Sequence, residues 1–153
     1  MLSFTQSTII VAALGIPAAY LAIHWSAFPE TVPMHFGPSG KPDGWGPRWT
    51  LVLLPVIGVV VVSMLTIGKR FPSHFNYPVR VTDENVTHQR ALAVGLLDQL
   101  RLVVAVMLAY ISLQQMRTAL GLTDGLGVWF LLVFVIAMLG SLATYFTRAI
   151  RAR

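Results

Sequence analysis

The amino-acid sequence predicts an all-α integral membrane protein, a four-helix bundle that forms one domain over residues 1–153. Four separated apolar runs each approach the roughly 20 residues that a helix needs to cross a hydrocarbon core about 30 Å thick. Of the 153 residues, 56% are hydrophobic and 11% are charged, whereas soluble domains carry about 25% charged residues. Because backbone polar groups in hydrocarbon must be paired within their own segment, these runs should be helices.

The four predicted spans cover residues 7–27, 50–68, 91–113 and 127–146. We expect the first span to be a retained helix and not a cleaved signal peptide, because no basic residue precedes it. The third span should belong to a longer helix that begins at the N-cap Thr82 and ends near Thr118. Asp83 and Glu84 would then lie in its first turn, where they suit the helix dipole. At 1.5 Å per residue this helix is about 54 Å long, so we expect a cytoplasmic extension of several turns.

The basic residues are distributed unevenly between the two sides of the predicted bundle. Eight of the 11 lie on one side: Lys69, Arg70, Arg80, Arg90, Arg101, Arg148, Arg151 and Arg153. The other side has Lys41, Arg48 and Arg117. Because positive residues mark the cytoplasm, we expect both termini and the second loop to be cytoplasmic. The first loop, residues 28–49, should then be a structured extracytoplasmic segment.

Turn-forming residues fill this first loop. It contains five prolines and four glycines, which exclude a regular helix: Pro29, Pro33, Pro38, Pro42, Pro47, Gly37, Gly40, Gly44 and Gly46. Trp45 and Trp49 suit the headgroup belt, where a ring has an apolar body and a polar edge. We therefore expect an ordered loop without regular secondary structure that folds onto the outer surface.

Two titratable side chains in the loop, His35 and Asp43, form the candidate site. A chain reversal at residues 39–40 would bring them together. Such a pair either binds a metal or moves a proton on an outer-leaflet substrate, or it is structural, with each side chain bonded to the loop backbone. His24 and Glu30 would complete a metal shell, since two histidines and a carboxylate form a catalytic zinc set, although the spacing matches no strong zinc motif.

The expected recognition surface consists of His35, Phe36, Asp43, Trp45 and Trp49. The catalytic candidates are His35 and Asp43, and the metal candidates are these two with His24 and Glu30. No cofactor is predicted, and a divalent metal is the alternative.

On the cytoplasmic side, the residues that precede and begin the long third helix allow a second site. His74, Glu84 and His88 would form either a metal or anion site or a solvated helix start, since Glu84 and His88 are four residues apart. Asp98 and Arg101 lie three apart at the inner end of the third span, where we expect them to form an ion pair.

Several function classes are excluded or disfavoured. The absence of cysteine excludes disulfides, thiolate metal sites and catalytic thiols. The sequence contains no stripe of basic residues interleaved with aromatic residues, so nothing in it indicates nucleic-acid binding. Apart from the third span, which contains Asp98 and Arg101, the predicted spans have no charged residue at their centres. This argues against autonomous active transport. Phosphate-binding glycine loops, nucleophile elbows and zinc-protease helices are also missing.

Two motifs in the first loop carry a family resemblance. P-x-H-F at residues 33–36 and G-x-P-D-G-W at 40–45 resemble a bacterial membrane domain of unknown function. That domain forms the N-terminal part of immunity proteins against the sporulation-delaying toxin and also occurs alone in small membrane proteins. N-Y-P at 76–78, T-x-E-N at 82–85 and Gln89 are similar to the following segment of such standalone members. The resemblance implies a four-helix protein of the bacterial inner membrane and assigns no chemistry. The immunity proteins add a multi-helix C-terminal half that does not follow here.

Together these features favour a small non-enzymatic membrane protein that serves in sensing, in immunity or as an accessory subunit. The alternative is a membrane enzyme that acts on a lipid or other hydrophobic substrate through His35 and Asp43. A third interpretation is a subunit of an efflux or transport machine with a cavity shared between chains. The expected partners are the lipid bilayer, a protein partner or a second copy, and a hydrophobic ligand.

Overall fold

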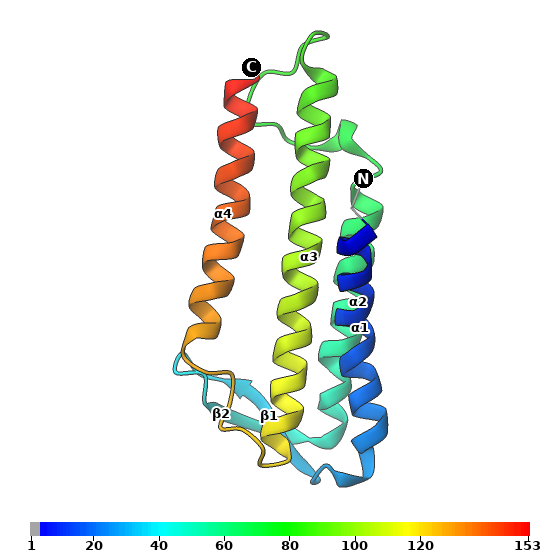
Figure 1. Ribbon diagram of the computed structural model, residues 1–153, viewed down its shortest axis with the longest axis vertical. Helices are drawn as coiled ribbons and strands as arrows, with labels where there is room; N and C mark the ends of the chain where they lie inside the picture. Colours follow the sequence, from blue (N-terminus) through cyan, green and yellow to red (C-terminus); the bar gives the residue numbers. More distant parts are fainter. Residues whose placement is uncertain (1–3) are drawn as a thin grey trace.

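The predicted spans are confirmed as long helices in the computed structural model, which describes residues 4–153 (Figure 1). The helices are α1 (Phe4–His24), α2 (Leu53–Gly68), α3 (Val86–Ala119) and α4 (Trp129–Arg151). Short 3-10 turns extend two of them, η1 (Trp25–Ala27) after α1 and η2 (Arg48–Val52) before α2. All four helices are long and apolar enough to cross a membrane. The chain is therefore a multi-pass membrane protein of the predicted fold class.

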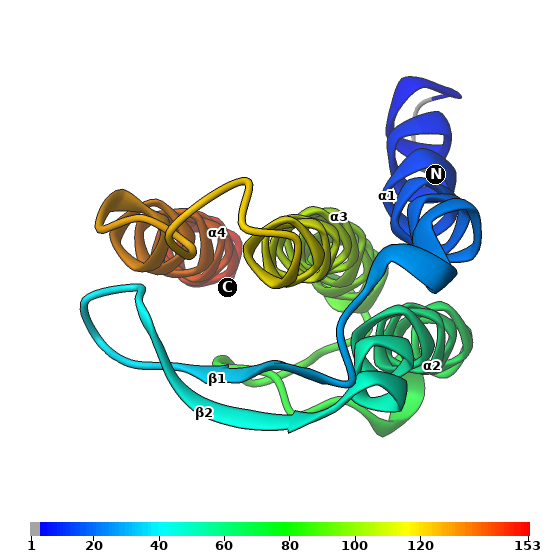
Figure 2. The same cartoon turned by 90° about the horizontal axis from the view of Figure 1, so that it is seen from below.

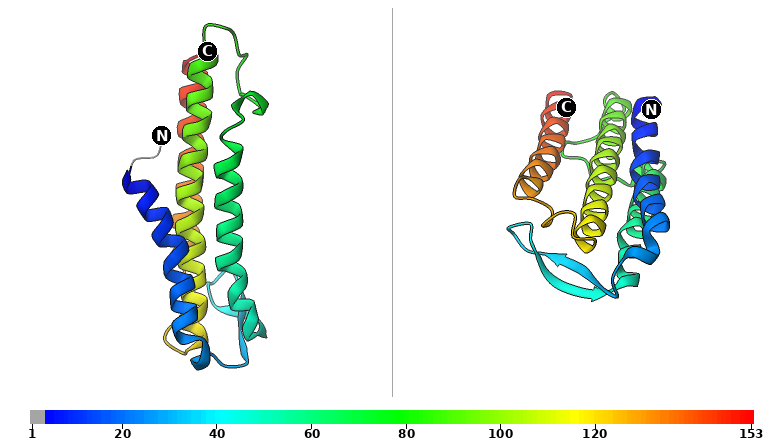
Figure 3. Two further views of the ribbon diagram at one scale, coloured as in Figure 1. Left: turned by 90° about the vertical axis from the view of Figure 1, so that its right-hand side faces the viewer. Right: turned by 60° about the horizontal axis from the view of Figure 1, so that its bottom comes forward.

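The two ends of the bundle are built differently. The connection between α1 and α2 lies at one end, which we call the hairpin end, and the start of α1 and the C-terminus lie at the other, the termini end (Figure 1, Figure 3). With 34 residues, α3 is about 51 Å long, and it projects past α1 and α2 at the termini end (Figure 1). The proline-rich loop and the extension of α3 therefore lie at opposite water boundaries, as the sequence predicts.

The bundle is asymmetric around α3. This helix packs against α1 and α2 on one side, whereas α4 packs mainly on α3 alone (Figure 2). The 18-residue apolar stretch of α4 has no buried residue, and the corresponding stretches of α1 and α2 are 17% buried. Such exposure of apolar side chains in water would mark a large interaction surface. In a bilayer the acyl chains cover it.

Three buried clusters lie at three depths between the helices. At the hairpin end Leu21, Phe28, Val32, Leu51 and Met116 pack together. In the middle, Ile10 and Val62 pack against Ala105. At the termini end, Ala93 of α3 contacts Tyr145 and Ala149 of α4. The small alanines on α3 allow close helix approach.

The beginning of α3 differs from the prediction. The helix starts at Val86 and its N-cap is Asn85, so the expected start at Thr82 is too early. Residues 82–85 instead form a turn in which the Thr82 amide donates to Oδ1 of Asn85 at 2.9 Å. The Asn85 side chain also donates to the Arg80 carbonyl at 3.1 Å. This local side-chain bonding competes with helix formation and delays the helix.

Buried polar groups hold the termini end of α3 to its neighbours. Oδ1 of Asp98 accepts hydrogen bonds from Nη1 of Arg101 at 3.0 Å and from Nζ of Lys69 at 2.8 Å. The expected Asp98–Arg101 pair is therefore present, and Lys69 joins it from the end of α2. Buried Gln89 donates to the Ala149 and Ala152 carbonyls at 2.9 and 3.0 Å, so it caps the last turn of α4 from the side.

Candidate functional site

The loop between α1 and α2 is a β-hairpin, where the sequence predicted no regular secondary structure. Strand β1 (Thr31–Phe36) pairs antiparallel with β2 (Pro42–Pro47), with irregular register on both sides of His35. The turn closes where the Gly37 amide donates to the Lys41 carbonyl at 2.9 Å. In a two-stranded ribbon both strands are edges, so prolines are tolerated at positions that do not need an amide donor. The prolines therefore exclude a helix without excluding strands.

The hairpin brings His35 and Asp43 together, as a chain reversal near residue 40 predicts. Nδ1 of His35 lies 2.5 Å from Oδ1 of Asp43, and the two side chains are 71% and 51% exposed. Two glycines make room for the pair. A Cβ at Gly37 would lie 2.7 Å from Oδ2 of Asp43, and one at Gly44 would lie 2.9 Å from Cβ of His35. The glycines of the motif therefore have a steric reason to flank this pair.

Exposed apolar side chains neighbour the pair along the chain: Met34 is next to His35, Trp45 is two residues after Asp43 on β2, and Trp49 follows in η2. Trp45 and Trp49 are each 58% exposed, and Met34 is 51% exposed. Phe36 is half-buried beside the turn. The expected recognition residues thus lie in one continuous segment, which carries an ionisable pair and several aromatic side chains.

His24 and Glu30 do not join His35 and Asp43. Nδ1 of His24 donates to the Tyr20 carbonyl at 3.0 Å, and its ring stacks on Tyr20 with 4.2 Å between centroids. Glu30 is exposed at the base of the hairpin, where its carbonyl accepts from the Arg48 amide at 2.9 Å. Among residues 4–153 no group of three or more His, Asp or Glu side chains is placed to hold a metal. The geometry therefore provides a two-residue site at this position.

The inward side of the hairpin is anchored on α3. Nε2 of Gln115 donates to the Pro33 carbonyl at 2.7 Å, and Gln115 is 2% exposed. Beside it, fully buried Val32 packs on Met116. Sequence reasoning missed Gln115 because a glutamine near a helix end has many uses. No signal in the sequence distinguishes it from the neighbouring Gln114.

Replacing Gln115 with leucine should lower the free energy of unfolding by about 1–2 kcal/mol, because the Pro33 carbonyl stays buried and loses its donor. Thermal unfolding in detergent measures this, and hydrogen exchange should show faster exchange in β1. Gln99→Leu is the matched control, since Gln99 is exposed on the same helix. An equal effect of the two substitutions would contradict the anchoring role.

The tip of the hairpin is held by the connection between α3 and α4. The Leu126 amide donates to the Gly40 carbonyl at 2.8 Å, and the Leu126 carbonyl accepts from Tyr110 at 2.7 Å. A Cβ on Gly125 would lie 2.1 Å from the Gly40 oxygen, and one on Gly40 would lie 2.7 Å from the Gly127 oxygen. We call this the tip contact: Gly40, Gly125, Leu126 and Gly127. Only glycine backbones approach this closely.

Comparison with known proteins confirms a domain of unknown function over about a third of the chain. Residues 12–59 match the family described as "Domain of unknown function (DUF1648)", which covers most of α1, the hairpin and the start of α2. An uncharacterized protein of Archaeoglobus fulgidus is 34% identical over 74 residues, which cover 43% of this chain. The match spans 40% of that protein's length. No solved structure matches the chain.

Proposed function

We propose that this small membrane protein is a binding subunit whose hairpin recognises a partner at the extracytoplasmic surface of the bacterial cytoplasmic membrane. The observation that supports this is the contrast between the anchored backbone of the hairpin and its exposed side chains. Gln115 and the tip contact fix its inward side. The exposed His35–Asp43 pair and exposed Trp45 lie on the hairpin, and exposed Trp49 follows it in η2. A fixed backbone with exposed, chemically varied side chains loses little entropy on binding.

The fold itself needs these exposed groups very little. Exposed ion pairs contribute about 0–1 kcal/mol to stability. The two tryptophans each leave 58% of their surface exposed, and tryptophan is a residue type that concentrates binding energy in protein interfaces. The surface therefore suits a protein partner that meets both a charged pair and exposed aromatic side chains. Sensing, toxin immunity of the sporulation-delaying type and an accessory role in a larger complex would all use this same surface.

Site-specific photo-crosslinking in cells tests this proposal. A benzophenone amino acid replaces Trp45, and the matched control is Leu139 in the middle of α4, because the two side chains are 58% and 59% exposed. We expect a discrete protein adduct from position 45 and lipid adducts from position 139. The protein adduct should fall severalfold when His35→Ala and Asp43→Asn are combined with the probe. An adduct of twice the chain mass identifies a second copy as the partner.

Two outcomes would refute the binding role. One is lipid adducts at both positions without any protein adduct. The other is a protein adduct at position 45 that the His35→Ala and Asp43→Asn changes leave untouched.

One observation favours the second candidate function, a membrane enzyme acting on a lipid headgroup or another hydrophobic substrate. The 2.5 Å contact between His35 and Asp43 resembles the arrangement in which a carboxylate orients a histidine general base. A metal held by this pair would require further ligands from substrate or water. Metal analysis of purified protein beside His35→Ala tests that version, and equal near-zero contents would eliminate it.

The proposed orientation predicts a labelling pattern, because the chain contains no cysteine of its own. Ser39 lies exposed in the hairpin turn, and Ser73 lies exposed at the termini end within η3 (Pro72–His74). A membrane-impermeant maleimide should label Ser39→Cys in intact cells and Ser73→Cys only after permeabilisation. The reverse pattern would place the hairpin in the cytoplasm.

A further inference from the structure

The ion cluster at the termini end has more positive than negative charge. Lys69 and Arg101 share the single carboxylate of Asp98, and the side chains of Asp98 and Arg101 are each 10% exposed. One positive charge therefore remains uncompensated in a buried setting, which is unfavourable unless an anion is nearby. Nε of Arg101 is buried and has no hydrogen-bond partner within the described chain. Arg101 and Lys69 do not line the cavity that lies beside the cluster, so these cations act on that cavity through the net positive charge of the cluster and not through direct contacts.

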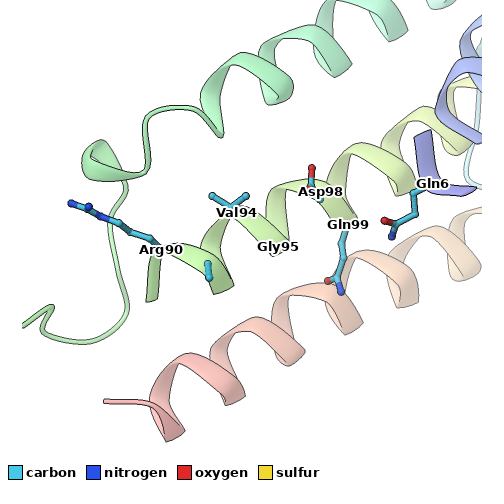
Figure 4. A pocket seen from close by; sticks show the side chains of 7 residues that line it. Gln6, Arg90, Val94, Gly95, Asp98 and Gln99 are labelled. Carbon is cyan, nitrogen blue, oxygen red and sulfur yellow. The ribbon is translucent and has the colours of Figure 1, made fainter. Parts of the chain in front are cut away.

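A cavity of about 490 Å³ lies directly beside this cluster. Asp98 lines it, together with Arg90 two turns earlier on α3, Gln99, and Gln6 from the start of α1 (Figure 4). Gly95 lies in its lining between Arg90 and Asp98, and nothing stands within 4 Å of where a Cβ would be on this glycine. The cavity is therefore open and is lined by charged and amide side chains.

The charge around the cavity determines which ions it accepts. The lining itself holds one cation, Arg90, and one carboxylate, Asp98. Because Lys69 and Arg101 both pair with that carboxylate from outside the lining, the four side chains together sum to +2. A cation is disfavoured at such a site. An anion with several acceptor oxygens would accept hydrogen bonds from the Arg90 guanidinium and the Gln99 amide together.

The position of the cavity along the membrane normal indicates the source of that anion. Gln6 is in the first turn of α1, and Lys69 directly follows the last residue of α2. The cavity thus lies where two of the spans end, at the level of lipid headgroups. Basic pockets between membrane helices on the cytoplasmic side bind acidic headgroups. We propose that this cavity binds the phosphate group of an anionic lipid. The inference rests on the proposed orientation of the chain but not on the proposed recognition role, because the site is separate from the hairpin.

Lipid retention measured by native mass spectrometry tests this site. The protein is reconstituted in nanodiscs containing phosphatidylglycerol, phosphatidylethanolamine or phosphatidylcholine and is then released for analysis. We expect about one phosphatidylglycerol retained per chain and about tenfold weaker retention in Arg90→Gln, which removes one charge-assisted contact. Gly95→Leu should reduce retention similarly, because it fills the cavity without changing any charge.

Arg148→Gln is the matched control, since Arg148 is an exposed arginine at the same end of the molecule, in the last turn of α4, and does not line the cavity. It should retain phosphatidylglycerol as the unchanged protein does. A parallel thermal-unfolding series with inorganic phosphate separates the two sources of the anion. Stabilisation by phosphate that Arg90→Gln abolishes would assign the site to the free ion. Equal retention of all three lipids, or equal losses in Arg90→Gln and Arg148→Gln, would overturn the proposal.

Discussion

Asp98→Asn should lower the free energy of unfolding by about 3 kcal/mol, because removing one partner of a buried ion pair leaves its charges uncompensated. In this chain the substitution leaves two cations, Lys69 and Arg101, within hydrogen-bond range of a neutral amide. Lys69 is 23% exposed and can regain some hydration, whereas Arg101 has little access to water. Denaturant titration in detergent micelles measures the effect.

Lys69→Gln is the control that tests whether the surplus positive charge causes the loss of stability. This change leaves one carboxylate and one guanidinium, so the cluster becomes neutral and the expected loss is about 1 kcal/mol or less. The double variant, Asp98→Asn with Lys69→Gln, should recover part of the stability that Asp98→Asn loses. If Lys69→Gln were as harmful as Asp98→Asn, the surplus charge of the cluster would not govern its stability.

The second large effect is expected from Gly125→Ala at the tip contact. The new Cβ would lie 2.1 Å from the Gly40 oxygen, and Gly125 has a φ of +143°, a conformation that L side chains rarely adopt. Strain of this kind contributes about 1–3 kcal/mol, and the collision with a backbone oxygen adds to it. We therefore expect a loss of about 2–4 kcal/mol, together with release of the hairpin tip. Thermal unfolding measures the loss, and hydrogen exchange at residues 37–41 and 124–128 measures the release.

Gly121→Ala separates strain from contact in the same connection. Gly121 has a φ of +70° and nothing within 4 Å of its Cβ position, so only the left-handed backbone is disfavoured, by about 1–2 kcal/mol. Exchange at the hairpin tip should remain slow in this variant. Equal acceleration of tip exchange in both variants would show that the tip contact does not hold the hairpin.

The helices were predictable because membrane spans depend on local composition alone. The 21 residues of α1 and the 23 of α4 lie where the apolar runs are, since hydrocarbon permits little else. The meeting of His35 and Asp43 was also predictable, because glycines and a nearby reversal lie between them in the sequence. Their roles in binding or catalysis remain predictions.

The hairpin and its anchors were not predictable from local signals. Prolines at residues 33, 42 and 47 disfavour strands inside a wide sheet. They are tolerated here because the sheet has only two strands, so both are edge strands. The hydrogen bond from Gln115 to Pro33 joins residues 82 positions apart, and Gly40 meets Leu126 across a similar separation. Such contacts depend on how the helices pack, which the sequence pattern does not specify.

The attachment of α4 has a consequence for its response to the thickness of the bilayer. Its apolar part, which ends before Arg148 in the last turn, spans about 28 Å and matches a typical hydrocarbon core of about 30 Å, so in a thinner bilayer it must tilt or bend. Near the hairpin end the stacked rings of Tyr110 and Phe130 join it to α3, and at the far end Gln89 holds its last carbonyls. We therefore expect thinning of the membrane to curve the middle of α4 away from α3, because both of its ends are held.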